Sequence, residues 1–359
     1  MAFLVDDDFL NSLLERILEL KSFEKKTVFS ISTTAKQEQS PYFTPVRVCK
    51  DFVIGGCIIF DQKHLCSLLE NIDGNVDIIL SDSEKMIPLH VRKVNYGVVD
   101  RSDQLGEVTI SNICHQAIKK SYIFEFKPND LTVNAAWSFL SQRLNYLNGK
   151  KICILGSGNI GSKLALKFVE CGAEVSIYRR NIDKGNIIVN GLNLIKPESV
   201  NAKIQFYSDT AQASSMADVL IGASNGSPII DENIVKNLRR DCLIVDLGKN
   251  NLTENAIKIA IEYSMNIYRT DVTPAIESFV YELLKTQDIL KHSCGKKDLG
   301  FCNIVSGGYF GRIGDIVVDS IDNPIRVLGV ARGNGLLKQA LNTTDKDNIE
   351  RLKKSLSIE

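Results

Sequence analysis

Three glycines with a fixed spacing form the pattern in this sequence that points most directly to chemistry. Gly156, Gly158 and Gly161 form G-x-G-x-x-G, directly after the apolar run at 151–155 and directly before a helix-forming segment. In that context the first glycine allows a tight turn, the second lets the backbone approach a pyrophosphate, and the third lets the helix pack closely. The free N–H groups at the start of the helix would face the phosphates. We therefore expect a dinucleotide to bind Gly156, Ser157, Gly158, Asn159, Ile160 and Gly161.

The residues after the next strand indicate which dinucleotide this is. The run at 174–178 ends in Tyr178, and Arg179 and Arg180 follow it. NAD sites usually place Asp or Glu near this point to bind the ribose 2′-hydroxyl, whereas Arg accommodates a 2′-phosphate. The sequence therefore favours NADP, and Tyr178 or Arg179 could also stack on the adenine. Two alternatives stay open: the arginines belong to a solvated loop, or the domain binds no ligand.

Two further loops follow later strands, at the strand ends where doubly wound sheets bind ligands. The first covers residues 223–228 and the second covers residues 246–251. Small residues in the first loop would allow the nicotinamide ribose to pass closely, although Asn-Gly and Gly-Lys-Asn are also good turn formers in any protein. The predicted cofactor contacts in these loops are Ala223, Ser224, Asn225, Gly226, Asp246 and Gly248.

Hydride transfer needs a proton donor and often a cation that holds a substrate carboxylate. Lys249 follows a strand end next to the expected nicotinamide, and Asp271 follows the last strand, where it could instead cap the next helix. Tyr309 and Arg312 lie in a glycine-rich segment that could close over a substrate, although Arg312 could equally be a surface residue. These four residues are the catalytic candidates. The isolated His64, His90 and His115 are interpreted as structural.

The elements that must position these residues follow from the pattern between residues 151 and 269. Apolar strands alternate there with amphipathic helices, which predicts a parallel sheet covered on both faces. We expect one helix before this region, at 131–147, and another after it, at 274–291. The fold class is thus α/β, with a Rossmann doubly wound parallel sheet at 131–274.

The two flanking regions are less regular. Between residues 27 and 126, short apolar runs and a helix near 64–72 predict an N-terminal α/β substrate domain at 1–130, whose strand order stays open. Residues 275–359 contain short strands around a turn at 322–324 and a polar terminal helix. We expect this last segment to return partly to the N-terminal domain, which would give a bilobal molecule.

Composition excludes several classes of protein. The 359 residues hold 43 Lys and Arg against 43 Asp and Glu, so no net field draws the chain to nucleic acid or to a membrane. The longest apolar run, at 52–60, is shorter than the ~18 residues of a membrane span, and the acidic N-terminus does not resemble a signal peptide. Nine cysteines without a C-x-x-C pair indicate reduced thiols, and His292, Cys294 and Cys302 match no zinc spacing. We expect a cytoplasmic protein without a metal.

Residues 128–272 resemble the cofactor domain of shikimate dehydrogenases, glutamyl-tRNA reductases and methylene-tetrahydrofolate dehydrogenases. In VSIYRRN, Arg179 matches the arginine of the Asn-Arg-Thr run with which shikimate dehydrogenases hold the NADP phosphate. The segment 217–250 resembles the folate enzymes, with matches at Gly226, Pro228, Asp246, Gly248 and Asn250. The resemblance implies a substrate domain and a cofactor domain that flank a cleft and are joined by the two long helices.

The resemblance covers under half of the chain and implies no particular substrate. The N-terminal half lacks the Ser-x-Ser-Pro signature of shikimate dehydrogenases, the catalytic Cys context of the tRNA reductases and a folate-site lysine motif. We expect an NADPH-dependent oxidoreductase, acting on a carbonyl, imine or related group of a small, polar, carboxylated metabolite, and forming a homodimer. The alternatives are an amino-acid or folate-type dehydrogenase working in the oxidative direction, and a non-catalytic NADP(H)-binding sensor or regulatory subunit.

Overall fold

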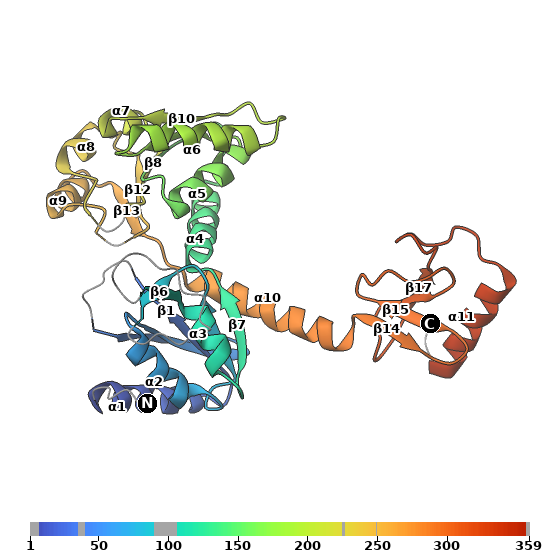
Figure 1. The fold of residues 1–359 in the computed structure, drawn as a ribbon. Coiled ribbons are helices and arrows are strands. Elements are labelled where there is room, and N and C mark those ends of the chain that lie inside the picture. Colours follow the sequence, from blue (N-terminus) through green and yellow to red (C-terminus); the bar gives the residue numbers. More distant parts are fainter. Residues whose placement is uncertain (1–6, 35–39, 90–105, 225–226, 249, 357–359) are drawn as a thin grey trace. The chain divides into compact units, whose positions relative to one another are not determined.

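The computed structural model describes residues 7–34, 40–89, 106–224, 227–248 and 250–356, and the chain divides into two compact units after Ala275. Figure 1 shows the elements of both units. In the part of the chain that the structure describes, the first unit contains two large sheets and a short two-stranded one, and the second contains one four-stranded sheet. Among the described residues, no helix combines the length and the apolar character that a membrane-spanning segment needs.

The N-terminal sheet has five strands in the order β2-β3-β1-β4-β7. Its strands are β1 (Lys26–Ser32), β2 (Tyr42–Val48), β3 (Phe52–Ile58), β4 (Ile78–Asp82) and β7 (Tyr122–Phe126), and only β2 pairs antiparallel. The apolar residues of α1 (Asp7–Lys21), α2 (Gln62–Ile72) and α3 (Ile110–Ala117) share one core with this sheet. A short pair, β5 (Met86–Pro88) and β6 (Glu107–Thr109), lies between β4 and α3 in the sequence. The predicted α/β domain is confirmed, and β3 begins at Phe52 as the apolar run at 52–60 predicts.

The second sheet of this unit has six parallel strands in the order β10-β9-β8-β11-β12-β13. They are β8 (Lys151–Leu155), β9 (Glu174–Tyr178), β10 (Ile204–Tyr207), β11 (Val219–Gly222), β12 (Leu243–Asp246) and β13 (Asn266–Arg269). Numbered from β8, the order is 3-2-1-4-5-6, which is that of the Rossmann fold. The predicted doubly wound sheet is therefore confirmed, and its order reverses between β8 and β11.

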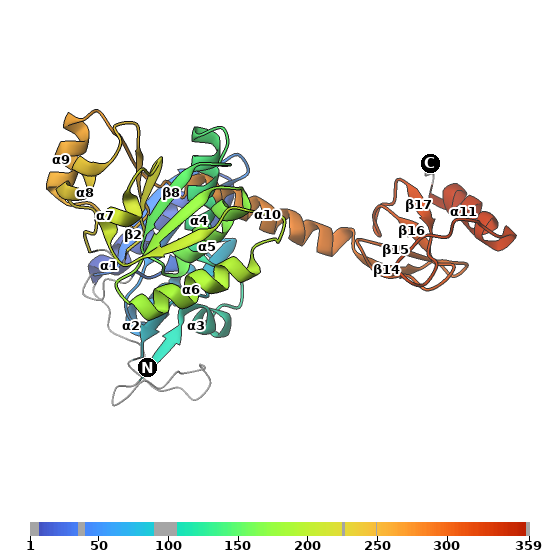
Figure 2. The same ribbon diagram turned by 90° about the horizontal axis from the view of Figure 1, so that it is seen from above.

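Helices cover both faces of this sheet (Figure 2). One face packs against α4 (Pro128–Arg143), α5 (Asn159–Glu170) and α6 (Ile182–Ile195). The other face packs against α7 (Thr210–Ser214), α8 (Glu232–Asn237) and α9 (Glu254–Glu262). The helix predicted at 131–147 begins earlier, because Pro128 suits a first helical turn. It also ends earlier, and Asn145 just beyond it has a positive φ of 61°.

The second unit begins within α10 (Thr273–His292) and has its own sheet and core. Its strands, β14 (Gly295–Asp298), β15 (Asn303–Ser306), β16 (Ile316–Val318) and β17 (Val327–Val330), pair in that order. Leu352 of α11 (Thr343–Leu356) is buried in the same core as Ile304 and Ile316. These strands join neither of the two large sheets of the first unit. That residues 275–359 return partly to the N-terminal domain stays a prediction.

Candidate functional site

A pocket of about 270 Å³ lies where the order of the Rossmann sheet reverses, at the carboxyl ends of β8 and β11. Doubly wound sheets bind their ligands at this point. The pocket brings together three segments that are far apart in the sequence and that were each predicted to bind the cofactor. Its lining residues are Gly156, Ser157, Gly158, Tyr178, Arg179, Arg180, Asn181, Ala223, Ser224 and Ile229.

The three glycines of the G-x-G-x-x-G segment have different surroundings. Gly156 has a φ of +124°, and a Cβ there would lie 2.5 Å from the carbonyl oxygen of Ala223. A Cβ on Gly161 would lie 1.9 Å from the carbonyl oxygen of Gly156, so only glycine allows α5 to approach β8. A Cβ on Gly158 would meet nothing within 4 Å. Gly158 therefore leaves space in front of α5, whose N-cap residue it is and whose first turn has no side-chain cap.

The two arginines after β9 differ in their contacts. Arg179 donates a hydrogen bond from Nη1 to the carbonyl oxygen of Ser157 at 2.6 Å, which places its guanidinium against the glycine loop. Arg180 is exposed, lines the same pocket and forms no hydrogen bond or ion pair with any residue that the structure describes. No carboxylate is among the lining residues. The pocket can therefore receive an anionic group beside two cations.

The loops after β11 and β12 are joined to each other beside the pocket. Asn251 accepts hydrogen bonds from the backbone N–H and hydroxyl of Ser224 and donates one to the buried carboxylate of Asp246. Asp246 also accepts the N–H of Gly248 at 3.1 Å. Of the predicted contacts, Ala223 and Ser224 line the pocket, whereas Asp246 and Gly248 are not among its lining residues. Asp246 is connected to the pocket through Asn251 and Ser224, and Gly248 is bonded to Asp246. The predicted contacts Asn225 and Gly226 lie outside the described residues.

The four predicted catalytic residues fall in different parts of the chain. Lys249, like His90, lies outside the part of the chain that the structure describes. Asp271 accepts hydrogen bonds from the hydroxyl and N–H of Thr273, the first residue of α10, and these bonds lower the pKa of its carboxyl. Asp271 therefore makes the contacts of a residue at the start of a helix. This is the alternative to a catalytic role that the sequence left open. Tyr309 and Arg312 are exposed residues of the second unit.

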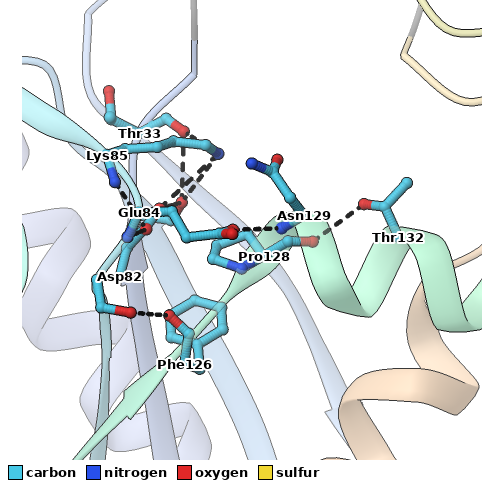
Figure 3. Close-up of polar contacts among 10 residues, drawn as sticks. Thr33, Asp82, Glu84, Lys85, Phe126, Pro128, Asn129 and Thr132 are labelled. Atoms are coloured by element: carbon cyan, nitrogen blue, oxygen red, sulfur yellow. Dashed lines mark hydrogen bonds and ion pairs between the residues drawn. The ribbon is translucent and has the colours of Figure 1, made fainter. Parts of the chain in front are cut away.

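Sequence reasoning missed a buried charged cluster at the carboxyl ends of β1 and β4 (Figure 3). The fully buried Asp82 accepts hydrogen bonds from the hydroxyl of Ser32 at 2.5 Å and from the N–H groups of Glu84 and Lys85. The Lys85 Nζ donates to the carbonyl oxygen of Thr33 at 2.7 Å and lies 3.8 Å from the Asp82 carboxylate. Burial raises the pKa of Asp82 in spite of these hydrogen bonds.

This cluster is connected to the elements that carry the pocket. Glu84 accepts the N–H of Asn129 at the start of α4, and its carboxylate lies 3.6 Å from Nζ of Lys163 on α5. Lys163 also pairs with Asp130. Although burial alone would raise it, the hydrogen bonds from Lys163 and Lys127 lower the pKa of Asp130. A usable signal was present in the sequence, because polar residues follow the apolar runs of both β1 and β4 directly.

Comparison with protein families places a match on the region that forms this pocket. Residues 138–267, which are 130 of the 359 residues, match the model of shikimate/quinate 5-dehydrogenase. The chain is 27% identical over 244 residues to the probable multifunctional siroheme biosynthesis protein HemA of Ruminiclostridium josui, covering 65% of this chain and 44% of that protein. It is 34% identical over 86 residues to the shikimate dehydrogenase (NADP(+)) of Psychrobacter cryohalolentis, covering 23% and 30%. The chain thus spans less than half the length of these relatives.

The likeness to solved structures covers more of this chain, at lower sequence identity. A shikimate dehydrogenase in complex with NADP+ is 12% identical with a TM-score of 0.41, covering 73% of this chain and 90% of that one. The ornithine carbamoyltransferase of Pyrococcus furiosus is 12% identical with a TM-score of 0.38, covering 75% and 89%. At these TM-scores neither structure bears on the assignment of the site.

Proposed function

We propose that this protein is an NADP(H)-dependent oxidoreductase that acts on a small polar metabolite carrying a carboxylate. The observation that carries the proposal is the pocket at the reversal point of the Rossmann sheet, with its glycine loop and its two arginines. The match to the shikimate/quinate dehydrogenase model covers this whole pocket and supports the same assignment.

The residues present fit a dinucleotide phosphate. The space in front of Gly158 and the uncapped first turn of α5 offer free N–H groups to a pyrophosphate without a side chain in the way. Arg179 and Arg180 line the same pocket, and the guanidinium of Arg180 is free of described partners. A 2′-phosphate beside them would receive charge-assisted hydrogen bonds that a ribose hydroxyl cannot match. NADP(H) is therefore the cofactor that we assign to the pocket.

On the substrate side, we assign the binding of a substrate oxygen to Lys85. NADPH, when bound, supplies a hydride. The Lys85 ammonium is held at Nζ by the carbonyl oxygen of Thr33 and by Asp82, and its side chain remains 29% exposed. From that position it can donate a hydrogen bond to a substrate carboxylate or to a carbonyl oxygen that gains negative charge during reduction. The catalytic roles predicted for Lys249, Asp271, Tyr309 and Arg312 stay predictions, as do the homodimer and the cytoplasmic location.

The first test is a calorimetric titration with NADPH and with NADH. The unchanged protein should bind NADPH more tightly than NADH, and Arg180→Ala should lose that preference, because about 1.5–3 kcal/mol of charge-assisted bonding corresponds to about 10- to 150-fold in Kd. Arg240→Ala is the matched control, since Arg240 stacks on Tyr263 away from the pocket. Failure to bind either cofactor would refute the proposal.

The second test separates an enzyme from a sensor. Oxidation of NADPH is followed by the loss of its absorbance with panels of keto acids and cyclic imines. A substrate that is turned over by the unchanged protein, and not by Lys85→Met with normal NADPH affinity, would support the role of Lys85. Equal turnover by both proteins would refute that role. Stoichiometric NADPH binding without turnover on any member of the panel would favour the sensor.

A further inference from the structure

A fully buried asparagine joins the two loops beside the cofactor pocket. Asn251 follows β12 and has no exposed surface. Its Oδ1 accepts the N–H of Ser224 at 2.8 Å and the hydroxyl of Ser224 at 2.5 Å. Its Nδ2 donates to Oδ1 of Asp246 at 2.6 Å. One side chain thus connects the end of β12 with the loop that leaves β11.

The carboxamide of Asn251 satisfies both partners at once, because it has an acceptor at one end and a donor at the other. The backbone N–H of Ser224 donates, so it needs an acceptor, and the carboxylate oxygen of Asp246 accepts, so it needs a donor. The two requirements fix which end of the Asn251 amide faces which loop. A carboxylate at position 251 would repel Asp246, and an aliphatic side chain would remove the hydrogen bonds that the amide makes to Ser224 and to Asp246.

The surrounding chain is built closely around this amide. A Cβ on Gly222 would lie 2.6 Å from the Cβ of Asn251, and one on Gly248 would lie 3.0 Å from its Nδ2. The backbone carbonyl oxygen of Asn251 accepts the N–H groups of Ile229 and Ile230 at 2.8 and 2.9 Å. Asn251 therefore holds the β11 loop at both of its ends, at Ser224 and at Ile229, and both of these residues line the pocket.

We propose that Asn251 is a positioning residue for the dinucleotide, which it never touches. It sets the part of the pocket lining that Ser224 and Ile229 form by fixing these two residues. This inference rests on the proposed function, because it assumes that the pocket holds NADP(H). The alternative is that the amide only contributes to the stability of the sheet, in which case its loss would lower Tm without changing affinity.

The variant Asn251→Asp distinguishes these two roles by its dependence on pH. Two carboxylates at hydrogen-bond distance disfavour each other's ionised form, so one of them takes up a proton more readily than a lone carboxyl does. Arg269, whose Nε lies 3.9 Å from the Asp246 carboxylate, favours the charged form of Asp246, so we expect the proton on the new carboxyl at position 251. When that proton is bound, the pair can again donate at one end and accept at the other. We therefore expect Asn251→Asp to bind NADP+ about tenfold more weakly than the unchanged protein at about pH 8. The deficit should shrink as the pH is lowered into the acidic range.

Two further variants complete the test. Asn251→Ala should bind weakly at both pH values, because no proton restores its missing bonds. Asn193→Ala is the matched control, since Asn193 bonds the N–H and carbonyl groups of Ile204 in the same way. Asn193 lies near the C-terminal end of α6 and does not line the pocket. The control variant should lower Tm and leave the affinity for NADP+ unchanged.

The outcomes separate the inference from the function on which it rests. If the unchanged protein binds NADP+ and Asn251→Ala binds it equally well, the positioning role is refuted and the proposed function stands. If the unchanged protein binds no NADP(H), the proposed function fails. Hydrogen exchange at the amide of Ser224, whose N–H is bonded to the Asn251 side chain, then decides the positioning of the loop. Faster exchange in Asn251→Ala supports the positioning role, and unchanged exchange refutes it.

Discussion

Alanine substitutions at Gly158 and Gly161 should separate binding from folding within a single loop. Both glycines belong to the same G-x-G-x-x-G segment, yet an added methyl group meets open space at Gly158 and a backbone carbonyl oxygen 1.9 Å away at Gly161. The backbone of Gly158 is extended, with φ −77° and ψ −165°, which alanine also adopts. Neither residue needs a positive φ, so the surroundings alone decide the effect.

The structure gives the two effects different magnitudes. Gly161→Ala forces backbone against backbone, and overpacking of this kind costs about 3 kcal/mol, or a loss of about 6–12 °C in Tm. Gly158→Ala exchanges glycine for alanine at an N-cap, which costs at most about 1 kcal/mol. Its methyl group would project towards the pyrophosphate and remove about 1.5–3 kcal/mol of hydrogen bonding, which is about 10- to 150-fold in the Kd for NADPH.

Thermal unfolding and NADPH titration on the same samples measure both quantities. Gly191→Ala is the control, because a Cβ there meets nothing within 4 Å on the surface helix α6, far from the glycine loop in sequence. It should leave the Kd unchanged and raise stability slightly, as alanine favours a helix. Normal affinity in Gly158→Ala, or normal stability in Gly161→Ala, would refute the reasoning.

Three other predictions concern the rest of the chain. Asp271→Ala should cost about 1 kcal/mol, because it removes both hydrogen bonds to the first residue of α10; a fall in kcat at unchanged Tm would instead support the predicted catalytic role. Lys338 bonds both carboxylate oxygens of Asp345 at 2.8 Å and lowers the pKa of that carboxyl. At neutral pH, hydrogen exchange in the second unit should therefore be slower in the unchanged protein than in Asp345→Asn. The difference should start to shrink below the ordinary aspartate pKa of about 3.9 and should vanish as the pH falls through the lowered pKa of Asp345. In the native protein a thiol reagent should modify the exposed Cys171 within minutes and should not reach Cys242, because burial raises the pKa of that thiol to about 12; equal rates would contradict the packing of the Rossmann sheet.

Local sequence was sufficient for the parts of this protein that depend on neighbouring residues. The glycine loop, the strand before it and the helix after it lie within twenty residues, and the conformation of each glycine is a local property. Arg179 and Arg180 follow the next strand directly, so their place at the pocket edge could also be predicted. The alternation of strands and helices determined the fold class in the same way, because period and capping are local signals.

The tertiary structure alone decided which distant polar groups meet. Ser32 and Asp82 are fifty residues apart, and they meet because β1 and β4 pair in parallel with Ile31 opposite Ser81. Ser224 and Asn251 meet because β11 and β12 are neighbours in their sheet. The order of the strands depends on how helices from elsewhere in the chain bury both faces of the sheet. A short stretch of sequence does not contain this information. A buried polar side chain takes its role from the partner that this packing supplies, so the amide of Asn251 and the ammonium of Lys85 became visible only in the folded chain.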